Sequence, residues 1–117
     1  MLKYIIQEQA HRLPDGRNVR RIKATCDFGN VKEGTIGGWV EADDNLSHDG
    51  LCWIADDAMA LGRSRVTCDA QLRDHARLSD WATITDRCIV CDDAQLRDSA
   101  FAYDSTVIGA KSVLADR

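Results

Sequence analysis

A strict repeat of six residues occupies the C-terminal part of the chain and limits its possible folds more than any other feature. The second position of the repeat is small in all eleven hexads, the fourth is apolar in all eleven, and the sixth is aspartate in eight. Such agreement in three columns indicates that the repeat itself dictates the local structure. The hexads cover residues 51–116 and read LCWIAD, DAMALG, RSRVTC, DAQLRD, HARLSD, WATITD, RCIVCD, DAQLRD, SAFAYD, STVIGA and KSVLAD.

An interval of six keeps equivalent residues on one side of an extended strand, whereas an α-helix would distribute them around its axis. We therefore expect positions two and four to point inward, positions three and five to point outward, and positions six and one to form a corner. Aspartate suits a corner because its short side chain bonds nearby amides and tolerates left-handed backbone conformations. One hexad cannot bury its apolar residue alone, so the hexads must stack into a solenoid.

The inward columns resemble the hexapeptide repeat of left-handed parallel β-helices, in which an aliphatic residue is followed four positions later by a small one. Ile54 with Ala58 and Leu72 with Ala76 follow this pattern. The resemblance implies an all-β fold in which three hexads, about 18 residues, form one triangular coil that advances the chain by one strand spacing of roughly 4.8 Å. Residues 51–117 would then form a β-helix of between three and four coils.

The first fifty residues do not follow the repeat and are expected to cap one end of the solenoid. The strand-like runs LKYIIQEQ and RNVRRIKATC flank LPDGR, whose Pro-Asp-Gly is a strong turn signal, so a β-hairpin is predicted there. The following glycine-rich and aspartate-rich stretch offers Phe28, Trp39 and Val40 as anchors. We interpret residues 1–50 as the capping region and residues 51–117 as the repeat, together forming a single structural domain.

The capping sequence extends the resemblance to a narrower group of proteins. RRIKATCDFGNVKEGTIGGWVEADDNLSHDGLCWIADDA is similar to the opening of a group of bacterial and phage proteins labelled hexapeptide transferases, which carry a like GGWV passage before their hexads. The resemblance covers essentially the whole chain. It implies the architecture and leaves the activity open.

The composition excludes several classes of function. With 19 acidic and 15 basic residues the formal charge is -4, which disfavours direct binding to nucleic acid. No apolar run approaches the roughly 18 residues needed to span a membrane, and five cysteines without a signal peptide indicate free thiols. A cytoplasmic protein is expected.

A histidine on one corner is the candidate for catalysis that the resemblance implies. Acyltransferases of the left-handed β-helix fold bind acyl-coenzyme A between neighbouring coils and use a histidine as general base. His75 occupies position one of a hexad, and Asp57 and Asp93 should lie one coil away on either side. The sequence shows neither the long extruded loop nor the C-terminal helix of those enzymes. We therefore favour a solvated His75, no catalytic residue and no cofactor, with His75 and acyl-coenzyme A as the alternative.

A metal site is not expected. Carbonic anhydrases of this fold use three histidines, whereas two of the three here, His11 and His48, belong to the capping region. Cys88 and Cys91 have the spacing of a zinc or redox pair, but no second pair follows them. Cys88 falls in the inward column and Cys91 in an outward one, so ordinary packing is the better interpretation.

Stacking at 18 residues sorts the outward positions into three faces, and apolar residues gather in the last two coils. Such a patch usually indicates a partner, and open strand edges invite pairing. We predict self-association through the C-terminal coils as a two-fold homodimer. The residues expected to form this interface are Ile89, Phe101, Tyr103, Val107 and Val113.

The corner aspartates form columns of negative charge along the solenoid, and turn chemistry explains why aspartate stands there. Because corner residues are also exposed, the columns could mimic nucleic-acid phosphates in the basic groove of a protein. The main functional prediction is a non-catalytic binding module, encoded by a phage or mobile element, that inhibits a nucleic-acid-binding host defence complex in an anti-CRISPR-like manner. The alternative is the acyltransferase centred on His75. The predicted partner-binding residues are Asp56, Asp74, Asp92, Asp80, Asp98, Asp86 and Asp104.

Overall fold

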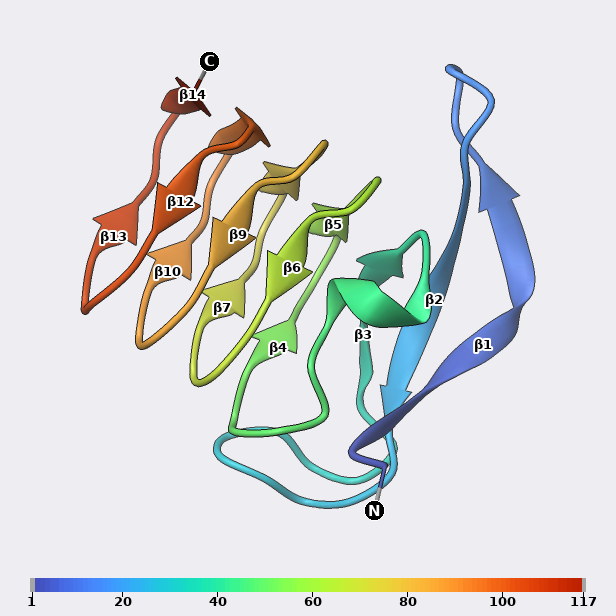
Figure 1. The fold of residues 1–117 in the computed structure, drawn as a ribbon. Helices are drawn as coiled ribbons and strands as arrows, with labels where there is room; N and C mark the ends of the chain where they lie inside the picture. Colours follow the sequence, from blue (N-terminus) through green and yellow to red (C-terminus); the bar gives the residue numbers. More distant parts are fainter. Residues whose placement is uncertain (1, 117) are drawn as a thin grey trace.

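The computed structural model describes residues 2–116, which form a parallel β-solenoid of about 4 turns with a β-hairpin at its N-terminal end (Figure 1). The all-β hexapeptide solenoid expected from the repeat is confirmed. Within these residues, no helix has the length and apolar character needed to cross a membrane.

Three stacks of short parallel strands form the sides of the solenoid, and the third stack continues at its N-terminal end into the hairpin as one seven-stranded sheet. Partner residues lie 18 apart, as in Trp53 with Gln71 and Gln71 with Ile89, so the expected coil length and the three faces are confirmed. One side contains β4 (Trp53–Ile54), β7 (Gln71–Leu72), β10 (Ile89–Val90) and β13 (Val107–Ile108). The second contains β6 (Arg65–Val66), β9 (Thr83–Ile84) and β12 (Phe101–Ala102). The third contains β5 (Met59–Ala60), β8 (Arg77–Leu78), β11 (Gln95–Asp98) and β14 (Val113–Asp116).

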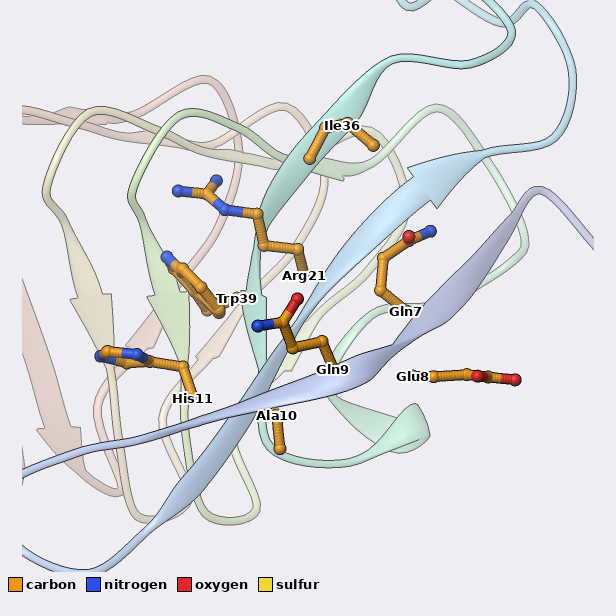
Figure 2. Close-up of a pocket in the computed structure, with 8 residues that line it drawn as sticks. All are labelled: Gln7, Glu8, Gln9, Ala10, His11, Arg21, Ile36 and Trp39. Atoms are coloured by element: carbon orange, nitrogen blue, oxygen red, sulfur yellow. The ribbon is translucent and has the colours of Figure 1, made fainter.

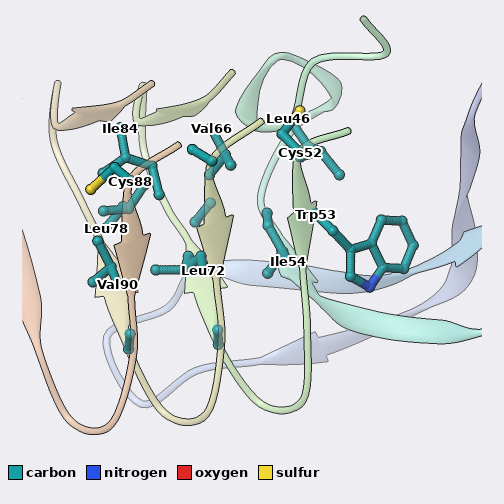
Figure 3. Close-up of a cluster of buried hydrophobic side chains, with 14 of the residues drawn as sticks. Leu46, Cys52, Trp53, Ile54, Val66, Leu72, Leu78, Ile84, Cys88 and Val90 are labelled. Carbon is teal, nitrogen blue, oxygen red and sulfur yellow. The ribbon is translucent and has the colours of Figure 1, made fainter. Parts of the chain in front are cut away.

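Positions two and four line one continuous core inside the three sheets (Figure 3). Ile54, Leu72 and Val90 are stacked along one side of this core and are fully buried. The small residues of position two, such as Ala58 and Ala76, are also fully buried. Each branched side chain removed from water contributes roughly 1.5–3 kcal/mol, so the repeated column supplies much of the free energy of folding.

Position six adopts a left-handed backbone conformation at ten successive corners, from Asp56 to Ala110, with φ between 56° and 62°. Most residues pay a steric cost for positive φ, whereas glycine does not and aspartate is more tolerant than most. This conformation turns the chain from one side of the solenoid to the next. It is the physical reason for the aspartate column.

The corner aspartates also link successive coils. Oδ2 of Asp74 accepts a hydrogen bond from the backbone N–H of Asp92 at 2.9 Å, and Oδ2 of Asp92 accepts one from the N–H of Ala110 at 2.8 Å. Each carboxylate therefore satisfies an amide that the strand pairing leaves free. The same contact joins Asp56 to Asp74, Asp80 to Asp98, and Asp86 to Asp104.

The predicted hairpin is present and covers the N-terminal end of the core. Strands β1 (Tyr4–Arg12) and β2 (Asn18–Ala24) pair antiparallel around a turn in which the N–H of Gly16 bonds the carbonyl of Leu13. Tyr4 and Ile22 are buried in the core cluster. The Tyr4 hydroxyl donates to the carbonyl of Leu46 at 2.6 Å, which fastens the cap to the first coil.

The segment after the hairpin already follows the path of a coil. Strand β3 (Ile36–Val40) pairs parallel with β5, a single-turn 3-10 helix η1 (Asp43–Asn45) follows, and Leu46 bridges Val66 on the second side. Gly38 allows this close stacking, because a Cβ atom there would collide with the carbonyl oxygen of Ala58. The GGWV passage therefore marks the point where the chain enters the solenoid.

Two residues that the repeat places on the outer surface are buried instead. Trp53 is 5% exposed and Leu61 is 4% exposed, so the expectation that every third and fifth position faces solvent is wrong for them. The ring of Phe28 packs edge-on against Trp53 with centroids 5.4 Å apart. Leu13 and Val19 of the hairpin region pack with Leu61. The N-terminal segment thus covers part of two faces as well as the end of the solenoid.

Candidate functional site

A groove lies on the outer face of the sheet that contains β3, β5 and β8. Two hollows of about 560 and 340 Å³ adjoin there and share His11 and Trp39. The larger is also lined by Gln7, Glu8, Gln9, Ala10, Arg21 and Ile36. The smaller is also lined by Asp57, Met59, His75 and Arg77.

The hairpin creates this groove by folding over the sheet. β1 is the edge strand of this sheet, next to β2, and the packing of Leu13 and Val19 against the outward Leu61 bends the hairpin toward the outer face. His11 is thereby brought to Trp39, with ring centroids 5.4 Å apart. The sheet supplies the floor, since Trp39 pairs with Met59 and Met59 pairs with Arg77.

Trp39 is the centre of the larger hollow. Figure 2 shows the Arg21 guanidinium, the His11 imidazole and the Gln9 amide grouped around its indole. The guanidinium carbon of Arg21 lies 4.3 Å from the ring centroid, a favourable cation–π position. The half-buried indole therefore forms a flat surface beside polar side chains.

Arg21 also fixes the acidic residue of the smaller hollow. One terminal nitrogen donates to the carbonyl oxygens of Gly37 and Asp56 at 2.9 Å each, and the other lies 2.6 Å from Oδ1 of Asp57. Oδ2 of Asp57 in turn lies 3.8 Å from Nε2 of His75. The result is a chain of contacts from a held guanidinium through a carboxylate to an imidazole.

His75 projects from its corner toward solvent. Its side chain is 72% exposed, so the imidazole is accessible to a molecule in the groove. The expectation that Asp57 lies one coil from His75 is confirmed by the 3.8 Å contact. Among residues 2–116, Asp57 is the acidic residue within ion-pair distance of the His75 side chain, and Asp93 is not. The site is therefore asymmetric, with the carboxylate on the N-terminal side of the histidine.

Comparison with known proteins gives a partial match to a curated protein and no family. No protein-family model matches the chain. Among curated proteins, it is similar to "Uncharacterized acetyltransferase YdcK" of Escherichia coli (strain K12), with 35% identity over 80 residues. The match covers 62% of this chain and 24% of the relative, so the chain spans about a quarter of that protein's length. By its repeat and its fold, this chain has the architecture of a hexapeptide-repeat β-helix.

The corner aspartates of this β-helix protein, predicted to bind a basic partner, have a structural task. Oδ2 accepts a backbone N–H from the next coil in Asp56, Asp74, Asp92, Asp80 and Asp86. Asp98 and Asp104 supply the amides for two of these bonds. The bonds account for aspartate at the corners without a partner, and partner binding stays a prediction.

The cysteines of the β-helix differ in their surroundings. Burial raises the pKa of the Cys88 thiol to about 11, and burial followed by the charges of Asp92 and Asp74 raises the pKa of Cys91. Sγ of Cys91 and carboxylate oxygens of Asp74 and Asp92 lie within 4.8 Å of one another. Oδ2 of each aspartate already accepts a backbone amide, so the coil-to-coil ladder explains this cluster. A hydrogen bond with Thr85 lowers the pKa of the exposed Cys68.

The apolar residues assigned to self-association lie on the C-terminal coils of the β-helix, but not all are equally exposed. Val107 is 65% exposed and Val113 50% exposed. Phe101 and Tyr103 are 58% and 53% exposed, and their rings pack together 5.6 Å apart. Ile89 is only partly exposed, so it contributes less surface than the repeat predicts.

Sequence reasoning did not bring His11, Arg21 and Trp39 into the site. The 18-residue register relates Met59 to Arg77, whereas Trp39 lies 20 residues before Met59 because the first coil is irregular. The fold-back of β1 rests on contacts of Leu13 and Val19 that no repeat encodes. The available signal was the outward Leu61, whose size indicates a covered surface.

Proposed function

We propose that the groove is an acyl-transfer site in which His75 acts as general base. In this role Nε2–H of His75 faces Asp57, and Nδ1 on the other side of the ring removes the proton from an acceptor hydroxyl or amine as the acceptor attacks the carbonyl carbon of an acyl thioester. The carbon–sulfur bond breaks, the acyl group passes to the acceptor, and the thiolate leaves with the proton as a free thiol. The donor would be acyl-coenzyme A.

The observation that carries this proposal is the contact chain from Arg21 through Asp57 to His75. A carboxylate beside an imidazole orients the ring and stabilises the imidazolium that forms during proton transfer. The bonds of Arg21 to two backbone carbonyls hold the carboxylate in position. The similarity to a protein named as an acetyltransferase supports the same reaction class.

The test combines donor binding with turnover. Acetyl-coenzyme A binding is measured by calorimetry, and thiol release is measured with a panel of amines and alcohols. We expect His75→Ala to abolish thiol release and Asp57→Asn to reduce it at least tenfold. The matched control is His48→Gln, because His48 is stacked on Tyr4, outside both hollows. Wild-type protein that neither binds acetyl-coenzyme A nor releases thiol would sink the proposal.

A second proposal concerns the C-terminal coils. The exposure of Phe101, Tyr103, Val107 and Val113 favours association of two copies through this surface. Light scattering should give a dimer for the wild type and a monomer for Val107→Asp combined with Val113→Asp. A monomeric wild type at high micromolar concentration would rule out this interface. The phage-encoded, anti-CRISPR-like inhibitor has no observation in its favour and stays a prediction from the sequence.

A further inference from the structure

We propose that the smaller hollow recognises a ligand with a flat apolar body and a carboxylate or phosphate group, held by Trp39, Met59 and Arg77. If the groove transfers acyl groups as proposed above, this ligand is the acceptor. Only the ligand's role as acceptor rests on that proposed function. Binding itself requires no acyl donor, so the two proposals can fail separately.

The three residues form one row across the sheet. Trp39 pairs with Met59 and Met59 with Arg77, so the row advances by two strand spacings, roughly 10 Å in all. It begins with an indole, continues with a polarisable thioether and ends with a guanidinium. Both the indole and the thioether favour contact with an aromatic or other flat apolar group. A molecule lying along this row would place its anionic end at Arg77.

Arg77 differs from Arg21, the other arginine of the groove, in how its guanidinium is bonded. Arg21 is bound to Asp57 and to two backbone carbonyls. Arg77 is exposed, and its guanidinium makes no hydrogen bond or ion pair with residues 2–116. A guanidinium presents its donors in a planar fork that fits a carboxylate or a phosphate.

The charges around Arg77 favour an anion although the whole chain is acidic. Of the residues that line the smaller hollow, Asp57 is the acidic one, and its carboxylate is paired with Arg21. The remaining charged side chain of that lining is the Arg77 guanidinium. This local cation would attract an anionic ligand at short range, where the screened charges of distant corners contribute little.

The position of His75 connects this recognition to the proposed chemistry. His75 precedes Arg77 by two residues and lines the same hollow. A ligand anchored by Arg77 and resting on Met59 therefore lies next to the imidazole. The hollow measures about 340 Å³, within the range of a small-molecule site, about 300–1,000 Å³, and it shares His11 and Trp39 with the larger hollow.

The test uses four simple probes and the indole N–H signal of Trp39 in a nitrogen–proton correlation spectrum, assigned with Trp39→Phe. Phenyl phosphate and benzoate carry both features, benzyl alcohol lacks the charge, and inorganic phosphate lacks the ring. We expect phenyl phosphate and benzoate to shift the Trp39 signal with dissociation constants at least tenfold lower than that of benzyl alcohol. Inorganic phosphate should leave the signal unchanged.

Two variants decide the role of Arg77. Arg77→Gln should weaken phenyl phosphate and benzoate at least tenfold and leave benzyl alcohol unaffected. Arg97→Gln is the matched control, because Arg97 lies on the next strand of the same sheet and does not line the hollow. The proposal is overturned if no probe shifts the Trp39 signal, if benzyl alcohol binds as tightly as benzoate, or if Arg77→Gln binds both anions like the wild type. If His75→Ala still binds phenyl phosphate but no longer releases thiol, both proposals are supported.

Discussion

Substitution of Asp80 separates the two tasks of a corner aspartate. Its backbone has φ of 58°, and its Oδ2 accepts the backbone N–H of Asp98 at 3.0 Å. Alanine must adopt the same positive φ, which it tolerates less well than aspartate does. It also removes the carboxylate that accepts the hydrogen bond. Glycine adopts the conformation freely but also lacks the acceptor. Asparagine retains the tolerance and a carbonyl oxygen.

The structure gives a magnitude for each variant. A left-handed conformation costs an ordinary residue roughly 1–2 kcal/mol. A hydrogen bond to a carboxylate contributes about 1.5–3 kcal/mol, and we take about 1 kcal/mol because the Asp80 corner is exposed to water. Asp80→Ala should therefore lower the free energy of unfolding by about 2 kcal/mol, Asp80→Gly by about 1–1.5 kcal/mol, and Asp80→Asn by less than about 0.5 kcal/mol.

Thermal unfolding followed by circular dichroism measures the series. For a chain of this size about 1 kcal/mol corresponds to roughly 4 °C, so alanine should lower Tm by roughly 8 °C. The matched control is Asp93→Ala, because Asp93 has no positive φ and its carboxylate accepts no hydrogen bond from residues 2–116. The reasoning is refuted if Asp80→Ala melts with the wild type, or if asparagine is as damaging as alanine.

Three further predictions concern single positions. Gly38→Ala should lower the free energy of unfolding by about 1–3 kcal/mol, because the new Cβ atom meets a backbone carbonyl. Urea titration measures this change, and an unchanged midpoint would contradict the close stacking at Gly38. Ser64→Ala should raise the free energy of unfolding by about 1 kcal/mol, since the buried hydroxyl has no hydrogen-bond partner among residues 2–116; a loss of stability would point to a partner. At pH 8, iodoacetamide should label Cys68 first, because its lowered pKa gives more thiolate, and Cys88 last, because its pKa is about 11; peptide mass spectrometry would expose the reverse order.

The repeat predicts the features that arise from contacts between successive coils. The burial of Ile54 and Leu72, the corner conformation of Asp74 and the contact of Asp57 with His75 all follow from a period of six and a register of 18. These features are local in the solenoid, so a sequence column is sufficient to locate them.

The repeat could not predict what the N-terminal segment does to the outer faces. The burial of Trp53 by Phe28 depends on non-repeating contacts, and so does the arrival of His11 at Trp39. The sequence places His11 in a cap and His75 in a hexad, and the folded hairpin makes them neighbours along one groove. The groove is thus a property of how the two regions meet.

The coil-to-coil bonds give the solenoid a chemical direction. Five corner carboxylates accept an amide from the coil that follows, namely those of Asp56, Asp74, Asp80, Asp86 and Asp92. Backbone amides of one coil donate to carbonyls of the following one, as Trp53 does to Ala70. The C-terminal edge of a coil therefore presents both backbone donors and carboxylate acceptors to the coil that follows. In this sense the molecule resembles a polar filament whose subunits are coils of one covalent chain. A coil with corner carboxylates presents these groups to whichever coil follows it, so each joint depends on the two coils that meet there and not on the number of coils.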